Sequence, residues 1–209
     1  MDVIKKLEWR YATKKFDSEK KLDKDTIEII KKAFDLTATS YGLQPIKLLV
    51  IGDESLKAQL LPHSWNQQQV VQASHLLVFC VETKVDESYI IEYFERVKNE
   101  RNTPDEILSP FRSNLIKSFE KMTDEEKHTW ASKQAYLAMG NLLTVCSMIN
   151  VDACPMEGFM PSKYDEVLKL NEKGLSSVLA MPVGYRAEDD MFSSFKKVRK
   201  GLNESIIEI

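Results

Sequence analysis

Glycine is scarce in this chain, which has only seven glycines among 209 residues. No two of them are separated by a single residue, and none precedes a Walker-type lysine and serine or threonine. Such glycines let a backbone approach phosphate groups closely in dinucleotide-binding, P-loop and kinase loops. All three motifs are therefore excluded, and any nucleotide must be held by other groups.

Histidine and cysteine are also scarce, with three residues of each type. The histidines lack HExxH spacing and have no cysteine cluster near them in sequence, so no metal site is predicted. The cysteines form no CxxC pair and lie among apolar neighbours, which predicts buried, reduced thiols in a reducing compartment rather than nucleophiles. A GxSxG elbow is absent too, which removes support for a serine hydrolase.

The chain also lacks an excess of positive charge and an apolar run long enough to span a membrane. The net charge of -3 argues against a dedicated nucleic-acid-binding protein, so small molecules or protein are the expected partners. The N-terminus has no apolar signal core, which predicts a cytoplasmic protein. Residues 135–151 carry no charge but fall short of the roughly 20 residues that a spanning helix needs. We interpret this run as a buried core helix, with no contact with a membrane.

The hydrophobic pattern predicts a mixture of helices and buried strands in one large domain. Thr123 and Glu126 have the spacing of a capping box, which places the start of a long central helix at that point. Further helices are expected at 2–9 and 23–38, and strands at 47–51, 75–81 and 177–183. Residues 88–122 interrupt this order with two charged, amphipathic helical patterns, and such an insertion often covers a site.

The last six residues, 204–209, contain three isoleucines and have strand propensity. An exposed apolar strand would favour aggregation, so we expect it to be paired. It pairs either within its own chain or with the sheet of a second subunit. The second alternative, together with the apolar central helix, predicts a homodimer.

Two basic clusters lie at opposite ends of the chain, in residues 10–15 and 196–200. If the two ends meet in the fold, their arginines and lysines form one anion site, because phosphate requires several fixed, charged donors. The alternative is two separate, solvated cationic patches.

Several short motifs, in order along the chain, resemble those of the FMN-dependent nitroreductase family. They are the run RYATKKFD at 10–17, Gln44-Pro45 after Thr39-Ser40, the turn Pro155-Met156-Glu157-Gly158 and the closing Lys197-Val198-Arg199. Asn66 ahead of residues 73–75, and KQAYL at 133–137 leading to Gly140-Asn141, are similar to the oxygen-insensitive NAD(P)H nitroreductase and dihydropteridine reductase branch. The resemblance covers essentially all of residues 1–209 as a single domain.

The resemblance implies a homodimeric α+β fold, in which helices flank a small mixed sheet and the C-terminal strand is exchanged with the partner. It also implies FMN at the subunit interface. By this resemblance, the FMN phosphate would be held by Arg10, Lys14, Lys197 and Arg199, and the ribityl chain would contact Tyr11 and Ala12. The pyrimidine edge would be bound by Asn66, and the ring would be contacted by Met156, Glu157 and Gly158. Thr39 and Ser40 would approach from the partner subunit. The Glu157 backbone N–H is expected to face flavin N5. Taken alone, a segment such as residues 155–158 is most often just a turn.

The resemblance implies ping-pong hydride transfer from NADH or NADPH, through FMN, to a flat, electron-poor acceptor such as a nitroaromatic, a quinone or a pterin. No acid–base side chain is assigned, because the cofactor supplies the chemistry. A flavin-binding or storage protein without turnover is the alternative, whereas flavin-destroying and dehalogenating enzymes need lid elements that this sequence does not show.

Four residues are expected on the substrate side: Ser40, Tyr41, Gln69 and Phe119. Gln69 stands where relatives often have a lysine. Without this cation the 2'-phosphate of NADPH would be bound less tightly, so NADH is favoured over NADPH. Tyr41 and Leu43 are expected to make the acceptor pocket more apolar. Phe119 corresponds to an aromatic residue at the mouth of the substrate channel, although a core position in its helix is an open alternative. We attribute the pattern at Gln134 and Tyr136 to packing.

Overall fold

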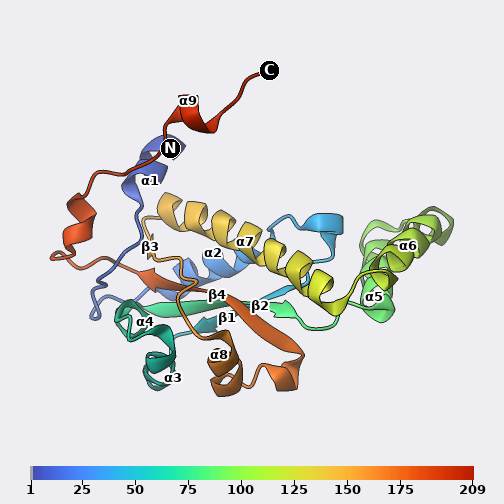
Figure 1. The fold of residues 1–209 in the computed structure, drawn as a ribbon, viewed down its shortest axis with the longest axis horizontal. Helices are drawn as coiled ribbons and strands as arrows, with labels where there is room; N and C mark the ends of the chain where they lie inside the picture. The colour runs from blue at the N-terminus through green and yellow to red at the C-terminus, as the bar shows by residue number, and fades with distance from the viewer. Residues whose placement is uncertain (1) are drawn as a thin grey trace.

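A four-stranded sheet lies at the centre of the computed structural model, which describes residues 2–209 (Figure 1). The strand order is β1-β2-β4-β3, and every pairing between the described strands is antiparallel. The expected α+β class is therefore confirmed. The expectation of a mixed sheet was wrong, because the described residues form parallel pairing only as an isolated bridge between Ala12 and Ala153. The strands are β1 (Ile46–Ile51), β2 (His75–Glu82), β3 (Asp152–Ala153) and β4 (Leu175–Gly184).

Helices cover both faces of this sheet (Figure 1). Leu77 and Phe79 of β2 belong to the core under one helical layer, and Leu76 and Val78 belong to the core under the other. This alternation explains the continuous apolar run of β2, because side chains on both faces of the strand are buried. One layer contains α2 (Lys24–Asp35) and α7 (Asp124–Met148), and the other contains α3 (Glu54–Leu60), α4 (Gln69–Gln72) and α8 (Pro161–Val167).

Helix α7 begins at the predicted capping box. The Thr123 hydroxyl accepts a hydrogen bond from the Glu126 amide at 3.2 Å, and the Glu126 carboxylate accepts one from the Thr123 amide at 2.7 Å. The second half of α7 is buried on one side, while Tyr136 and Leu137 are 48% and 55% exposed on the other. The helix is thus central to the core, as predicted, and it also presents an apolar outer surface. No helix within residues 2–209 is both long enough and apolar enough to cross a membrane.

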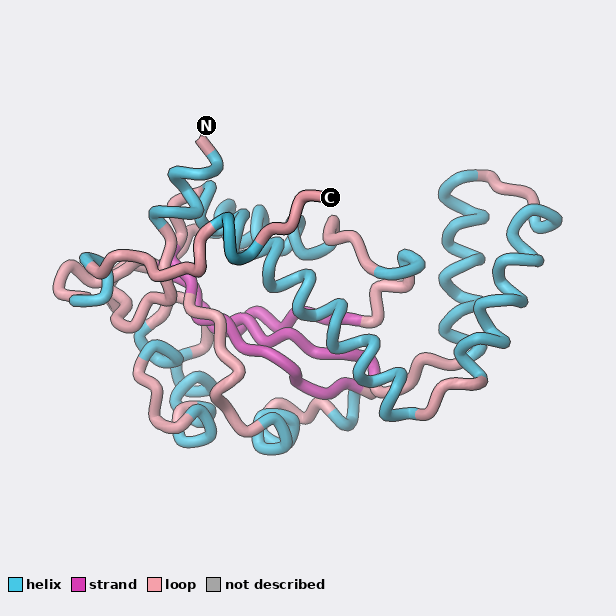
Figure 2. Tube along the Cα trace, turned by 45° about the horizontal axis from the view of Figure 1, so that its top comes forward, coloured by secondary structure: helices cyan, strands magenta, loops and turns pink. Residues whose placement is uncertain are grey.

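The predicted insertion forms a helical hairpin at one end of the molecule (Figure 2). It consists of α5 (Glu87–Arg101) and α6 (Asp105–Glu120), which are joined by residues 102–104, with Asn102 in the left-handed conformation. Phe94, Leu115 and Phe119 belong to an apolar cluster separate from those on the two faces of the sheet. Leu43 and Trp130 also contribute to this cluster, so it joins the hairpin to the rest of the molecule.

The chain termini differ from the expectation at one point. The helix predicted at 2–9 is formed as α1 (Val3–Trp9), with Asp2 as its N-cap, but the strand expected over residues 204–209 is not formed within the described chain. Instead, α9 (Leu202–Ser205) makes a helical turn, and the last residues lie beyond it, away from the sheet (Figure 1). No edge of the chain's own sheet pairs with this segment within the described residues. Its exchange with a partner subunit stays a prediction.

Candidate functional site

The two basic clusters meet in the fold. The Lys197 ammonium donates a hydrogen bond to the carbonyl oxygen of Arg10. A cavity of about 430 Å³ lies where the two segments meet. Its lining residues come from both ends of the chain and from one turn between them: Arg10, Tyr11, Ala12, Lys14, Pro155, Phe192, Phe195, Lys196, Lys197 and Arg199. We call this cavity the basic pocket.

The charges of the basic pocket are unbalanced. Among the described residues, none of Arg10, Lys14, Lys197 and Arg199 forms an ion pair with a carboxylate. Burial and the nearby Arg199 guanidinium lower the pKa of Arg10. Burial, Arg10 and Arg199 likewise lower the pKa of Lys197. Cations that disfavour one another in this way are stabilised when a multivalent anion lies between them.

Asp190 holds the backbone on one side of the basic pocket. It is 3% exposed, and its carboxylate accepts hydrogen bonds from the Tyr11 hydroxyl at 2.9 Å and from the amides of Lys14, Lys15 and Phe192 at 3.0, 3.2 and 3.1 Å. Burial acts to raise the pKa of Asp190, but these hydrogen bonds outweigh it, and the pKa is lowered. No local pattern indicated this role, because Tyr11, Lys14 and Lys15 lie 179, 176 and 175 residues away from Asp190 along the chain.

A second carboxylate, Asp152, anchors Arg186. Arg186 donates to Asp152 from its amide at 2.9 Å and from Nε at 2.8 Å. Its guanidinium also stacks over the rings of Trp9 and Tyr11, at 4.2 and 4.6 Å from their centroids. Arg10, which follows the last residue of α1 in extended backbone, lines the basic pocket. Arg186 is thus neutralised by Asp152 and is not among the residues that line the basic pocket.

The turn at residues 155–158 borders the basic pocket and leaves backbone donors free. Met156 is fixed to β4, since its amide and carbonyl bond to Ala180 at 2.8 and 3.0 Å. Within residues 2–209, neither the Glu157 N–H nor the Gly158 N–H has a hydrogen-bond partner. The Gly158 carbonyl accepts from Gln67 Nε2 at 2.7 Å. Two successive free N–H groups beside a cationic cavity can donate to a bound ligand.

Gly158 also brings the loop that contains Asn66 to this turn. A Cβ atom at position 158 would lie 2.8 Å from the Trp65 ring and 3.1 Å from Gln67 Nε2, so only glycine fits without displacement. Trp65 and Asn66 both have left-handed backbone, with φ of 53° and 56°. The close contact with Trp65 and Gln67 places the exposed Asn66 at the same edge as Glu157.

The segment that contains Thr39 and Ser40 lies elsewhere in the chain. Gln134 on α7 accepts a hydrogen bond from the Ser40 amide at 2.9 Å, and Thr39 Oγ1 accepts one from the Gln44 amide at 3.0 Å. No hydrogen bond joins residues 39–41 to the turn at 155–158 among the described residues. A role for these residues in the site of this chain's partner, as the resemblance implies, therefore stays a prediction.

The residues expected on the substrate side differ in exposure. Tyr41 is 54% exposed, and its ring contacts Phe119 and Trp130, with centroids 6.3 and 6.5 Å apart. Phe119 itself is 3% exposed and packs edge-on against Trp130, which is the core position left open above. Gln69 and Leu43 are also buried, whereas Ser40 is exposed, so Tyr41 presents the accessible aromatic ring of this group.

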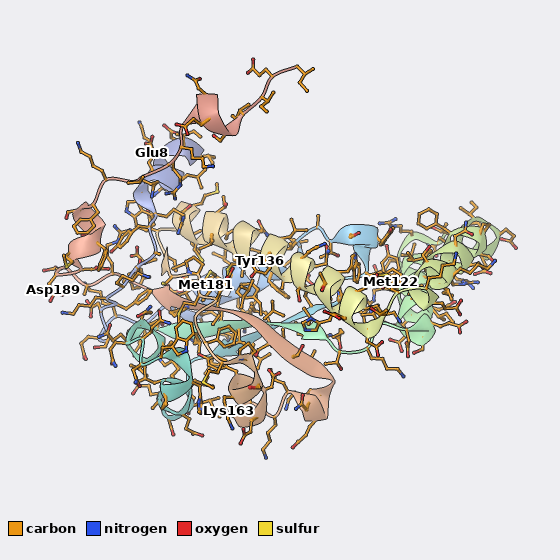
Figure 3. All side chains as sticks on the ribbon, viewed as in Figure 1. Glu8, Met122, Tyr136, Lys163, Met181 and Asp189 are labelled. Atoms are coloured by element: carbon orange, nitrogen blue, oxygen red, sulfur yellow. The ribbon has the colours of Figure 1, made fainter. Side chains whose placement is uncertain are left out.

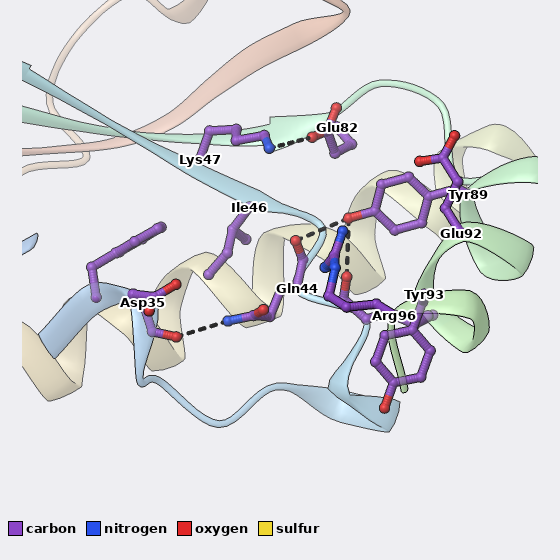
Figure 4. A pocket seen from close by; sticks show the side chains of 11 residues that line it. Asp35, Gln44, Ile46, Lys47, Glu82, Tyr89, Glu92, Tyr93 and Arg96 are labelled. Atoms are coloured by element: carbon purple, nitrogen blue, oxygen red, sulfur yellow. Dashed lines mark hydrogen bonds and ion pairs between the residues drawn. The ribbon is translucent and has the colours of Figure 1, made fainter. Parts of the chain in front are cut away.

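A separate cavity of about 470 Å³ lies between the end of α2, the start of β1 and α5 (Figure 4). Its polar groups are largely paired with one another. Lys47 lies 3.6 Å from Glu82, the Tyr89 hydroxyl lies 3.0 Å from the carbonyls of Leu43 and Gln44, and Gln44 Nε2 donates to the Asp35 carbonyl at 2.8 Å. These contacts brace the hairpin against the sheet. The cavity shares no residue with the basic pocket.

Two side chains of α7 whose pattern was attributed to packing, Gln134 and Tyr136, form hydrogen bonds with other segments. Gln134 fixes the Ser40 amide, and the Tyr136 hydroxyl donates to the Glu157 carboxylate at 2.8 Å. Tyr136 and Leu137 also line an open apolar groove of about 730 Å³, with Lys133 and Gly140. The three cysteines are buried and unpaired, as predicted, and residues 2–209 contain no cluster of metal-ligating side chains.

Comparison with known proteins identifies the family. A model of the nitroreductase family matches residues 7–185 of the chain. The chain belongs to this family. Two relatives named oxygen-insensitive NAD(P)H nitroreductase are 28% identical over 221 residues, from Salmonella typhimurium, and 30% identical over 220 residues, from Enterobacter cloacae. Each alignment covers 100% of both chains.

Solved structures show the same fold. A crystal structure from Exiguobacterium sibiricum, solved in complex with FMN, superposes with a TM-score of 0.84 at 20% identity. The superposition covers 100% of this chain and 98% of the other. The nitroreductase family and the α+β nitroreductase-like fold, both predicted from the motifs, are therefore confirmed.

Proposed function

We propose that this nitroreductase-family protein is an FMN-dependent oxidoreductase that uses NADH or NADPH to reduce a flat, electron-poor acceptor. The observation that carries the proposal is the basic pocket, where four cations without carboxylate partners lie beside two free backbone N–H groups. The names of the two relatives and the FMN complex of the structural neighbour support it.

The residues present fit FMN. Arg10, Lys14, Lys197 and Arg199 hold the phosphate, whose charge of about -1.5 to -2 would relieve the repulsion that lowers the pKa values of Arg10 and Lys197. The backbone of Tyr11 and Ala12, held through Asp190, follows the ribityl chain.

The other end of the ligand lies against the turn at 155–158. Asn66 has an exposed side chain at this edge and binds the pyrimidine ring. Met156, Glu157 and Gly158 would contact the ring system, and the free Glu157 N–H would be the donor to N5. A backbone amide suits this task because it donates a hydrogen bond without adding a group that titrates.

FMN held by these residues would supply the redox chemistry, which is hydride transfer from the nicotinamide to an acceptor that binds in the same place. A single place for both substrates requires that the oxidised nicotinamide leave first, so ping-pong kinetics are expected. The chain's own task is to bind, orient and shield, and no side chain is assigned as a general acid or base. Tyr41, with its exposed ring, is the residue that would stack on a nitroaromatic, a quinone or a pterin.

The active assembly in this proposal is a homodimer. The exposed apolar side of α7, which includes Tyr136 and Leu137, and the isoleucines of residues 206–209 remain uncovered in one chain. A second copy would cover both surfaces, and it would bring Ser40 and Tyr41 to the partner's flavin. The three unpaired cysteines support the reducing cytoplasm as its compartment.

The visible absorption spectrum of the purified protein tests the proposal. A yellow protein that bleaches with NADH or NADPH without oxygen, and recovers its colour with a quinone or nitroaromatic, is the expected result. A yellow protein that neither nucleotide bleaches would favour a flavin-binding or storage protein. A colourless protein that takes up no added FMN would overturn the assignment of the basic pocket.

A further inference from the structure

The turn at residues 155–158 is anchored from three directions. Met156 is bonded to β4 through Ala180, and the Gly158 carbonyl is held by Gln67, so the backbone on each side of Glu157 is fixed. The third anchor is the side chain of Glu157 itself. Its carboxylate accepts the 2.8 Å hydrogen bond from the hydroxyl of Tyr136, which lies midway along α7 (Figure 3).

This third anchor differs from the other two because it controls a charge. Glu157 is exposed, and a free glutamate side chain would sample several rotamers, some of them close to its own amide. Tyr136 holds the carboxylate at the far end of the side chain, on α7. The hydrogen bond to Glu157, followed by burial, raises the pKa of Tyr136 above its ordinary value. A tyrosine hydroxyl is protonated at neutral pH even without this shift, so it is available as a donor.

We propose that Tyr136 is a positioning residue, which holds the Glu157 carboxylate on α7 and so orients the free amides of Glu157 and Gly158 while keeping the carboxylate charge away from the flavin. This inference rests on the proposed function for its flavin-dependent part. Reduction of a flavin adds negative charge, so an unanchored carboxylate nearby would disfavour the reduced form. Tyr136 therefore raises the reduction potential and keeps the hydride acceptor well oriented.

The test compares Tyr136→Phe, Glu157→Gln and the double variant in the full-length protein loaded with FMN. Phenylalanine removes the hydroxyl alone, and glutamine keeps the shape of Glu157 without its charge. Thr144→Val is the matched control, because it removes another α7 hydroxyl, which bonds only to the Gly140 carbonyl of its own helix. The readouts are the midpoint potential of bound FMN, the FMN dissociation constant and the rate of flavin reduction by NADH.

Tyr136→Phe is expected to lower the midpoint potential and to slow flavin reduction by roughly three- to ten-fold, the range for loss of one hydrogen bond. FMN affinity should change little, since the phosphate donors are untouched. Tyr136→Phe should have no further effect on the potential in the Glu157→Gln background, because the charge is already absent. Thr144→Val should leave the potential unchanged. An unaltered potential in Tyr136→Phe, or the same shift in Thr144→Val, would overturn the proposal.

A measurement on the flavin-free protein separates this inference from the proposed function. Amide hydrogen exchange over residues 155–160 should be faster in Tyr136→Phe than in the parent and in Thr144→Val, since one anchor of the turn is lost. Equal exchange rates would show that Tyr136 does not hold the turn. A parent protein that takes up no FMN would overturn the proposed function instead, while exchange would still decide whether the anchor exists.

Discussion

The Lys197 ammonium donates to the Arg10 carbonyl, and this hydrogen bond joins two residues that are 187 positions apart in the sequence. The contact closes the basic pocket and leaves the Arg10 guanidinium available to a ligand. It also shows why the two ends of the chain act together, since neither cluster alone surrounds a cavity. The cations that this contact brings together are therefore expected to bind one ligand jointly.

Arg199→Ala and Lys14→Ala are each expected to weaken FMN binding by roughly ten-fold, the effect of losing one charge-assisted hydrogen bond in a partly exposed site. The flavin-to-protein ratio after dialysis and fluorescence titration of FMN measure the loss. Lys200→Ala is the control, because Lys200 belongs to the same cluster but does not line the basic pocket. Unchanged flavin content in both Arg199→Ala and Lys14→Ala would remove the reason for joining the two clusters.

Asp190→Asn is expected to destabilise the protein by about 1–3 kcal/mol and to weaken FMN binding. The asparagine side chain keeps one acceptor oxygen and has an NH2 group in place of the other. That NH2 group would face backbone N–H groups or the Tyr11 hydroxyl, which donate to the Asp190 carboxylate in the parent protein. Thermal unfolding with and without FMN measures both effects. A melting temperature and an FMN affinity equal to those of the parent would show that the four hydrogen bonds do not support the site.

The same residue predicts a dependence on pH. The folded-state pKa of Asp190 is lowered, so its stabilisation is fully present above the unfolded pKa of about 3.9 and is lost as pH falls through the lower, folded value. The difference in melting temperature between the parent and Asp190→Asn should therefore be constant from pH 7 to about pH 5 and shrink below pH 4. A difference that grows toward low pH would contradict this sign.

The sequence was most informative where a structure depends on neighbouring residues. The capping box at Thr123 and Glu126 and the apolar run of β2 each specify an element within a few residues, and both were predicted correctly. The family motifs then located the basic pocket and the turn at 155–158. Asp190 and Tyr136 were missed because their partners are distant in sequence, and a single aspartate or a tyrosine on an apolar helix carries no local signal.

Strand propensity did not decide how the terminal segment pairs. Three isoleucines in residues 204–209 have strand propensity, but a strand also needs an edge with which to pair, and that edge is not provided by the chain's own sheet. Gly201, at φ 89°, precedes the helical turn of α9 in its place. Propensity alone could not reveal this outcome, which depends on where the chain leaves the sheet.

Gly158→Ala is expected to destabilise the protein by about 1–3 kcal/mol, because the new methyl group would lie 2.8 Å from the Trp65 ring. The free amide at this position would be displaced as well, so FMN affinity should fall. Gly140→Ala is the matched control. A methyl group there meets nothing within 4 Å, and alanine is preferred over glycine inside a helix by about 1 kcal/mol. Urea unfolding of both variants distinguishes them, and equal stability would show that the Trp65 contact is easily relieved.

The residue at position 69 predicts a preference between NADH and NADPH. Gln69 is 5% exposed, and its amide donates to Gln67 Oε1 at 3.1 Å, so this position offers no cation to a 2'-phosphate. NADH should therefore have a higher kcat/KM than NADPH. In Gln69→Lys, the longer side chain can extend its ammonium toward solvent, which should shift the ratio toward NADPH by up to about ten-fold. Gln69→Met, which has similar volume and no charge, should leave the ratio unchanged. A clear preference of the parent for NADPH would mean that another cation recognises the 2'-phosphate.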